Sequence, residues 1–232
     1  MAKFGWEECK EEKIPTHPSK RFDREGMISR IKKKMAYTHS REVISKLSDS
    51  TTINIEGVHL TLYQGDICEL GVDAIVNAAN TYLRGGGGVD GFIHRAAGEE
   101  KLVSQMEKQY PKGCSYGECC MSESFKLPCA AIFHTVGPQE CMNDPLLASC
   151  YTSCLDELQG LKMRSIAFPA ISCGVFAYSE DIKRACKVAV DCTIEWIKQK
   201  QVKSGTTLKN VVFVCFSDDM YSTYKSYFRK LK

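Results

Sequence analysis

Two asparagines, a run of glycines and one aspartate lie close together in the chain and carry its clearest chemical signal. Asn77 and Asn80 follow a short apolar stretch, and four glycines, Gly85 to Gly88, lead to Asp90. Glycines before a helix let backbone N–H groups approach a phosphate at a helix end that already favours an anion. A carboxylate beside such a site is unfavourable unless it has a task, so we expect Asp90 to orient a water molecule or hold a hydroxyl group.

A second loop has the same design. Residues 170–176, Ala-Ile-Ser-Cys-Gly-Val-Phe, follow a predicted strand at 165–169 and precede a helix that Ser179 is expected to cap. Open α/β sheets bind ligands in the crevice outside the carboxyl ends of their strands. Two such loops in that crevice would hold a diphosphate from opposite sides.

The predicted elements bring both loops to one edge of a sheet. Residues 58–63 alternate apolar and polar side chains with the period of a strand. Apolar runs predict buried strands at residues 74–76, 130–136, 165–169 and 210–216. Helical spacing predicts helices at 89–97 and 99–110, from 144, after 179 and around 221–228. Strands that alternate with helices indicate a layered α/β fold.

The composition indicates one domain with a charged extension. The chain has 232 residues and a hydrophobic content of 44%, which is ordinary for a globular domain. Residues 1–50 hold 12 Lys and Arg against 8 Asp and Glu, whereas the rest hold 19 against 20. We expect residues 1–50 to form a partly helical extension and residues 51–232 to form the domain. The near-neutral charge of this domain argues against nucleic acid as its ligand.

The cysteines and the N-terminus indicate a reducing compartment. The 13 cysteines are an odd number and are spread through predicted strands and helices, so we expect reduced thiols. No apolar run is long enough to span a membrane, and the first residues lack the apolar core of a signal peptide. A cytoplasmic or nuclear location is therefore expected. The spacing of cysteines 114, 119, 120 and 129 fits no zinc motif, so no metal is expected.

Other residues have two interpretations each. Residues 86–91 match the dinucleotide-binding pattern G-x-G-x-x-G, but the preceding strand does not lead directly into them, which argues against a dehydrogenase. His94 lies one helical turn after Asp90, and His134 lies in a predicted strand; we expect both to be hydrogen-bonded core residues and not catalysts. The basic run at 30–34 is expected to be a solvated helix face. The docking positions expected for this helical region are Ile28, Ile31, Met35 and Ile44.

Five segments together resemble the macro domain family, and within it the MacroD type of ADP-ribosyl hydrolase. They are Gly-Asp-Ile at 65–67, Val-Asp-Ala-Ile-Val-Asn-Ala-Ala-Asn at 72–80, the glycine loop and helix at 85–98, His-Thr-Val-Gly-Pro at 134–138 and Ala-Phe-Pro-Ala-Ile-Ser at 167–172. The likeness covers about residues 58–230. It implies a three-layer α/β/α fold around a central mixed, mostly parallel sheet, with ADP-ribose across the strand ends and no cofactor.

The resemblance also implies roles for single residues. Asp66 would accept the adenine amine with help from the Ile67 backbone, and Phe216 would stack on adenine. Asn80 and Asp90 would be the catalytic residues, with Asn80 holding the distal ribose and Asp90 acting on a water molecule. The loops that would wrap the diphosphate contain Gly87, Gly88 and Val89 in the first and Ser172, Cys173, Gly174, Val175 and Phe176 in the second.

The implied reaction is the removal of mono-ADP-ribose from Asp or Glu side chains of modified proteins, by a monomer that needs no nucleic acid or membrane. Removal of the acyl group from O-acetyl-ADP-ribose is implied as well. The second loop departs from the MacroD pattern, because Ser172-Cys-Gly-Val-Phe-Ala177 stands where Ser-Thr-Gly-Ile/Val-Tyr-Gly is usual. This departure favours the alternative, a module that binds ADP-ribose without cleaving it.

Overall fold

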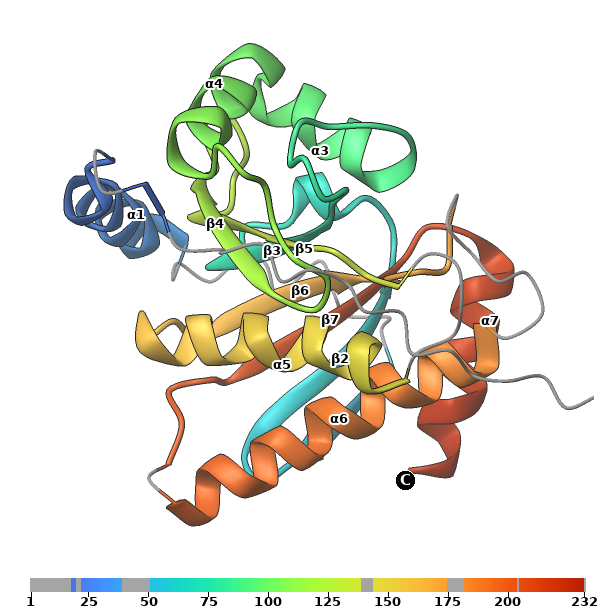
Figure 1. Ribbon diagram of the computed structural model, residues 1–232. Helices are drawn as coiled ribbons and strands as arrows, with labels where there is room; N and C mark the ends of the chain where they lie inside the picture. The colour runs from blue at the N-terminus through green and yellow to red at the C-terminus, as the bar shows by residue number, and fades with distance from the viewer. Residues whose placement is uncertain are drawn as a thin grey trace, which may run out of the picture.

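A single twisted sheet forms the centre of the protein (Figure 1). The computed structural model describes residues 18–19, 22–38, 51–138, 144–174, 182–203 and 205–231. In this part of the chain the sheet has seven strands in the order β1-β2-β7-β6-β3-β5-β4. Neighbouring strands from β2 to β5 in this order are parallel, and the two outer pairs, β1–β2 and β5–β4, are antiparallel. The predicted mixed, mostly parallel sheet is confirmed.

The strands follow the predicted apolar runs, with two additions. The bounds are β1 Thr51–Ile55, β2 Val58–Gln64, β3 Ala74–Ala78, β4 Cys119–Glu123, β5 Ala131–Thr135, β6 Ser165–Pro169 and β7 Asn210–Cys215. The five predicted strands agree with β2, β3, β5, β6 and β7 to within two residues. Both outer strands, β1 and β4, were not predicted.

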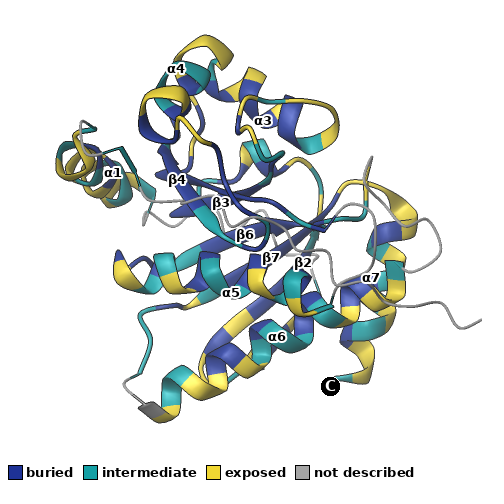
Figure 2. Cartoon of the chain, in the orientation of Figure 1, coloured by how far each residue is buried: buried dark blue, intermediate teal, exposed yellow. Residues whose placement is uncertain are grey.

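Helices cover both faces of the sheet. The bounds are α1 Arg24–Thr38, the short 3-10 helix η1 Ile67–Glu69, α3 Gly88–Ala97, α4 Glu99–Gln109, α5 Asp144–Gly160, α6 Ile182–Lys203 and α7 Asp218–Lys230. In Figure 1, α3 and α4 lie above the sheet and α5 and α6 lie below it. The strands are mostly buried while the outer sides of these helices are exposed (Figure 2). The three-layer arrangement is therefore confirmed.

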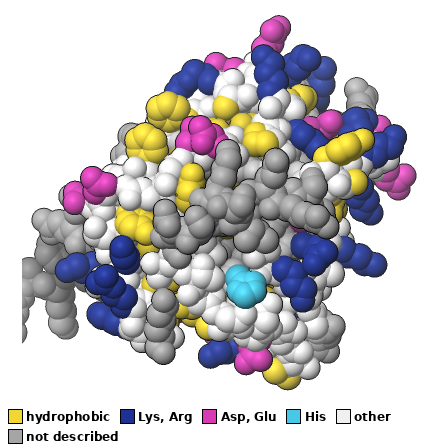
Figure 3. All heavy atoms as spheres, turned by 180° about the vertical axis from the view of Figure 1, so that it is seen from behind, with side chains coloured by type: hydrophobic (Ala, Val, Ile, Leu, Met, Phe, Trp, Pro, Cys, Tyr) yellow, Lys and Arg dark blue, Asp and Glu magenta, His cyan; other side chains and the backbone are white. Residues whose placement is uncertain are grey.

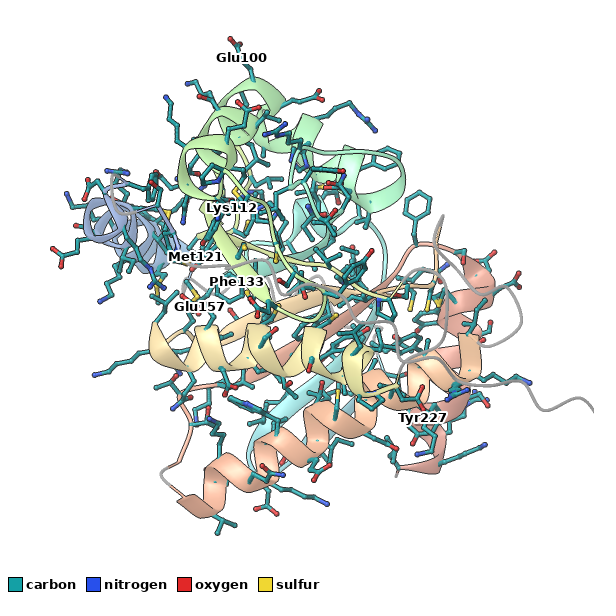
Figure 4. All side chains as sticks on the ribbon, viewed as in Figure 1. Glu100, Lys112, Met121, Phe133, Glu157 and Tyr227 are labelled. Atoms are coloured by element: carbon teal, nitrogen blue, oxygen red, sulfur yellow. The ribbon has the colours of Figure 1, made fainter. Side chains whose placement is uncertain are left out.

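Alternate residues of each strand supply two separate cores, as the pleat requires. On one face Val76 of β3 and Phe133 of β5 join buried residues of α5, α6 and α7. On the other face Ile75 and Ile132 join buried residues of α3 and α4. Figure 4 labels Met121 and Phe133, which pair across β4 and β5, on the α5 side of the sheet. Burial on both faces explains why these strands read as continuous apolar runs.

The N-terminal helix α1 docks on the far end of the sheet, beside β4 (Figure 1). Its residues Met27 and Ile31 are buried in the core shared with α5. The predicted docking positions Ile28 and Met35 pack against the same core, whereas Ile44 lies outside the described residues.

The basic run of α1 is only partly a solvated face, so that prediction needs correction. Arg30 pairs with Glu123 of β4 at 3.0 Å. Lys34 is half-buried. Its ammonium group donates to three oxygens of the turn that follows β4: Ser124 Oγ at 2.6 Å, the Phe125 carbonyl at 3.0 Å and the Leu127 carbonyl at 2.6 Å. Two cations of the run therefore attach the helix to β4, while Lys32 and Lys33 are exposed.

This docking predicts that α1 contributes to global stability. Ile31→Val removes one methylene from a fully packed position, so the free energy of unfolding should fall by about 0.5–1.5 kcal/mol. Urea denaturation measures this change. Lys33→Ala, at an exposed position of the same helix, is the control and should change the value by less than about 0.5 kcal/mol. Equal stability of the Ile31 variant and the wild type would mean that α1 unfolds separately from the sheet.

The surface carries charges of both signs. On the face that Figure 3 shows, Lys and Arg side chains stand in several groups near the edge, with acidic side chains beside some of them. None of the described helices is long and apolar enough to cross a membrane.

Candidate active site

A cavity of about 330 Å³ opens at the carboxyl ends of β2, β3, β6 and β7. This volume lies within the range of small-molecule sites. Residues that follow β2 and β7, the start of α3 and the loop after β6 form its wall. Both glycine loops therefore meet in the predicted crevice.

Nine of the predicted binding residues line the cavity: Asp66, Ile67, Gly87, Gly88, Val89, Ser172, Cys173, Gly174 and Phe216. Asn80 and Asp90 do not line it but lie behind the first loop, where both approach Gly86. Val175 and Phe176 lie outside the described residues, as does Ala177. Lining residues that the sequence did not predict include Phe92, Ala78, Val214 and Met220.

The first loop is built around close contacts that exclude side chains. A Cβ atom on Gly86 would lie 3.3 Å from Asn80 Nδ2 and 3.4 Å from Asp90 Oδ2. A Cβ atom on Gly91, inside α3, would lie 2.2 Å from the Gly86 carbonyl oxygen. The glycines thus let the loop fold back onto the helix, and α3 begins at Gly88 with its free N–H groups beside the cavity.

The second loop is held in an unusual backbone conformation. Ser172 has a φ of 58°, in the left-handed region that non-glycine residues seldom adopt. Its hydroxyl donates to the Pro138 carbonyl at 2.9 Å, which ties the loop to the segment after β5. Burial raises the pKa of the neighbouring Cys173 thiol to about 12. This thiol is therefore protonated at neutral pH, which argues against a reactive thiolate in this loop.

The Asp90 carboxylate is the centre of a buried polar network. It is 3% exposed and lies in the first turn of α3. Asn77 Nδ2 donates to its Oδ1 at 2.7 Å, and Asn80 Nδ2 lies 3.3 Å from its Oδ2. The Asn80 amide also donates to the Gly85 carbonyl at 2.7 Å. The two asparagines therefore fix both carboxylate oxygens from one side.

The two histidines of the site are fully buried, as predicted. His94 Nδ1 lies 3.1 Å from Asp90 Oδ1 and 3.0 Å from the Asp90 carbonyl. Burial lowers the pKa of His94, but the hydrogen bond to Asp90 and the charge of this carboxylate outweigh burial, so the net shift is upward. His94 thus combines a core position with direct contact to the carboxylate.

His134 supports the network from the opposite side. Its Nδ1 lies 3.1 Å from Asn77 Nδ2, and its Nε2 lies 2.9 Å from Ser122 Oγ. The Asn77 amide nitrogen can only donate, so His134 Nδ1 accepts and the ring proton is on Nε2. Burial, with a smaller contribution from His94, lowers the pKa of His134 to about 3. The neutral ring therefore holds the Asn77 amide in the orientation that serves Asp90.

Asn77 was singled out from the sequence without a role of its own, and Ser122 was not singled out. Asn77 belongs to β3 and Ser122 to the unpredicted β4, and both are fully buried. A buried polar residue inside an apolar strand is a signal that could have singled out Asn77, because such a group needs a partner.

The described cysteines are free thiols. Within the described ranges, no group of three or more His, Cys, Asp or Glu side chains is arranged to hold a metal ion.

Comparison with known proteins identifies the family of this chain. The chain matches the macro domain family over residues 76–189. It is 41% identical over 170 residues to the O-acetyl-ADP-ribose deacetylase of Salmonella gallinarum, covering 71% of this chain and 91% of that protein. It is 44% identical over 150 residues to the ADP-ribose glycohydrolase MACROD1 of Mus musculus, covering 62% of this chain and 45% of that protein.

A solved macrodomain structure has the same fold as this chain. The macrodomain of Trypanosoma brucei in complex with ADP-ribose superposes with a TM-score of 0.65 at 38% sequence identity, covering 72% of this chain and 68% of that one. The two relatives are 41% and 44% identical to this chain over 170 and 150 residues, and the solved structure shares its fold. This chain therefore belongs to the macro domain family.

Proposed function

We propose that the protein is a hydrolase that removes mono-ADP-ribose from acidic side chains of modified proteins. The observation that carries this proposal is the position of Asp90, a buried carboxylate held by two asparagine amides directly behind a loop that lines the cavity. A pure binding site for a diphosphate would gain nothing from a carboxylate at this place. The hydrolase names of two relatives support the proposal.

The proposed ligand, ADP-ribose, occupies the cavity along its length. Free N–H groups of Gly87, Gly88 and Val89 at the start of α3 bind the diphosphate from one side, and the loop from Ser172 to Phe176 binds it from the other. Asp66 accepts the adenine amine beside Ile67. Its Oδ1 already accepts from the Cys68 N–H at 2.8 Å, but a carboxylate has acceptor sites for further donors. Phe216 stacks on adenine, and Asn80 holds the distal ribose.

The proposed reaction is the hydrolysis of an ester. Asp90 orients a water molecule and accepts its proton as the water oxygen bonds to the ester carbonyl carbon; the bond from this carbon to the ribose oxygen breaks, the proton passes from Asp90 to that oxygen, and ADP-ribose and a free Asp or Glu side chain are released. Such an ester is labile enough for positioning and one base to suffice. The same step would remove the acetyl group of O-acetyl-ADP-ribose. We propose that the protein acts as a monomer in the cytoplasm or nucleus.

The second candidate is a reader that binds ADP-ribose without turnover. Cys173 favours it, because this residue lines the cavity where the MacroD pattern has a threonine. A protonated thiol is a weaker hydrogen-bond donor to phosphate than a hydroxyl group. Such a change weakens one contact of the second loop and leaves Asp90 and its asparagines intact.

The deciding experiment measures release and binding on the same preparation. Wild-type protein is incubated with matched substrates that carry mono-ADP-ribose on Glu, Ser or Arg, and free ADP-ribose is measured over time; calorimetry gives the affinity for ADP-ribose. We expect repeated turnover on the Glu-linked substrate. Binding without release from any substrate would make the protein a reader, and absence of both would overturn the proposed function.

A further inference from the structure

Two phenylalanines at the mouth of the cavity have most of their surface in solvent. Phe92 is 55% exposed and Phe216 is 82% exposed. Only five large hydrophobic residues of the described chain are this exposed, and these two line the same cavity. Exposed phenyl rings forgo the stabilisation that burial of such a side chain provides. Their shared position indicates an apolar partner that is absent from the free protein.

The two rings face each other from separate elements. Phe92 lies on α3 and Phe216 follows β7, yet their centroids are 6.4 Å apart and their planes differ by 29°. A flat ring between two others needs about 7 Å, twice the contact distance of carbon atoms. The 6.4 Å between the centroids is an upper limit on the spacing of the two planes, so these exposed rings must move apart to admit a planar ring. The Arg95 guanidinium lies 4.7 Å from the Phe92 centroid and supports that ring by a cation–π contact.

We propose that Phe92 is the second wall of a slot that holds the nucleobase between two aromatic rings. This inference rests on the proposed function and extends it, because it makes Phe92 a determinant of ligand specificity. Asp66 and Ile67 line the same cavity and give the slot a polar edge for an exocyclic amine. Stacking on both faces of the base strengthens binding in proportion to the area of the base. The slot therefore selects a purine nucleotide over a ligand that lacks the base.

The test compares ligands with and without the base. Phe92→Ala should weaken ADP-ribose binding by about 5- to 150-fold, the range expected for the loss of one base–aromatic stack. Binding of ribose 5-phosphate, which lacks the base, should not change. Phe92→Leu keeps the apolar volume and should show most of the same loss, since it lacks the π face. Tyr37→Ala, at an exposed aromatic residue of α1 outside the cavity lining, is the control and should bind both ligands like the wild type.

Nuclear magnetic resonance gives a second readout. In wild-type complexes the adenine H2 and H8 signals should move upfield under two ring currents, and either Phe92→Ala or Phe216→Ala should remove part of the shift. Unchanged affinity and unchanged adenine shifts in Phe92→Ala would overturn the slot, and so would equal weakening of both ligands. Failure of the wild type to bind ADP-ribose would instead refute the proposed function.

Discussion

Asp90→Asn is expected to lower the rate of ADP-ribose release by about 10²- to 10⁴-fold, the usual contribution of a positioned general base. The substituted amide has the size of the carboxylate, and its oxygen can still accept from Asn77. Its nitrogen cannot accept from Asn80, but that contact is the longer of the two, at 3.3 Å against 2.7 Å, so the fold should be retained. ADP-ribose affinity should persist or increase, because a negative charge close to the diphosphate is removed. Single-turnover release and calorimetry on the same preparation separate the two effects.

The matched control for this change is Glu100→Gln, which makes the same carboxylate-to-amide substitution. Glu100 is exposed on α4 and points away from the molecule in Figure 4. Its variant should turn over and bind like the wild type. An Asp90→Asn protein that keeps more than about a tenth of the wild-type rate would show that the base is another group, such as a substrate phosphate.

Acidification is expected to destabilise the protein through His134. The pKa of this ring is about 3 in the folded state, against 6.5 for a free histidine. Between these two pKa values the histidine is protonated in the unfolded chain but neutral in the folded protein. The free energy of unfolding therefore decreases as the pH falls. The loss is about 1.4 kcal/mol per pH unit, or about 2–3 kcal/mol between pH 6.5 and pH 4.5. Above pH 6.5 this contribution is constant.

Urea denaturation of the wild type and of His134→Gln at pH 7 and pH 4.5 measures this contribution of His134 to the free energy of unfolding. Glutamine can donate to Ser122 but does not titrate, so the difference between the two proteins should shrink as the pH falls. His59→Gln, at an exposed position of β2, is the matched control substitution. Parallel pH profiles of His134→Gln and the wild type would contradict the prediction.

The sequence predicted the inner strands because they are buried on both faces. A continuous apolar run is a local signal, and β3, β5, β6 and β7 each contain one. The outer strands lack it. In β1 only Ile53 is buried, and β4 reads Cys-Cys-Met-Ser-Glu, with no β-branched residue. The hydroxyl of the polar Ser122 is satisfied in a buried strand by the Glu123 carbonyl and by His134, and the pairing with His134 exists only after folding.

The candidate site also has a part that the sequence indicates and a part that only the folded structure reveals. Both glycine loops and Asp90 stand in contiguous motifs that the sequence singles out; residues of both loops line one cavity, and Asp90 lies behind the first loop. Asn77 and Phe92 stand in the same motifs, but their contacts are with His134 and Phe216, far along the chain. Because spacing alone does not reveal such contacts, their parts in the network and in the cavity mouth were not predicted.

The docking of α1 on β4 also has a consequence for synthesis on the ribosome. Arg30 and its partner Glu123 are 93 positions apart in the chain. At about 5–20 residues per second, the ribosome needs about 5–20 s to make β4 after α1 has been translated. During this interval Met27 and Ile31 have no core to enter, so the nascent helix presents an apolar stripe to solvent. Helix α1 is therefore a segment that we expect a nascent-chain chaperone to bind before β4 has been made.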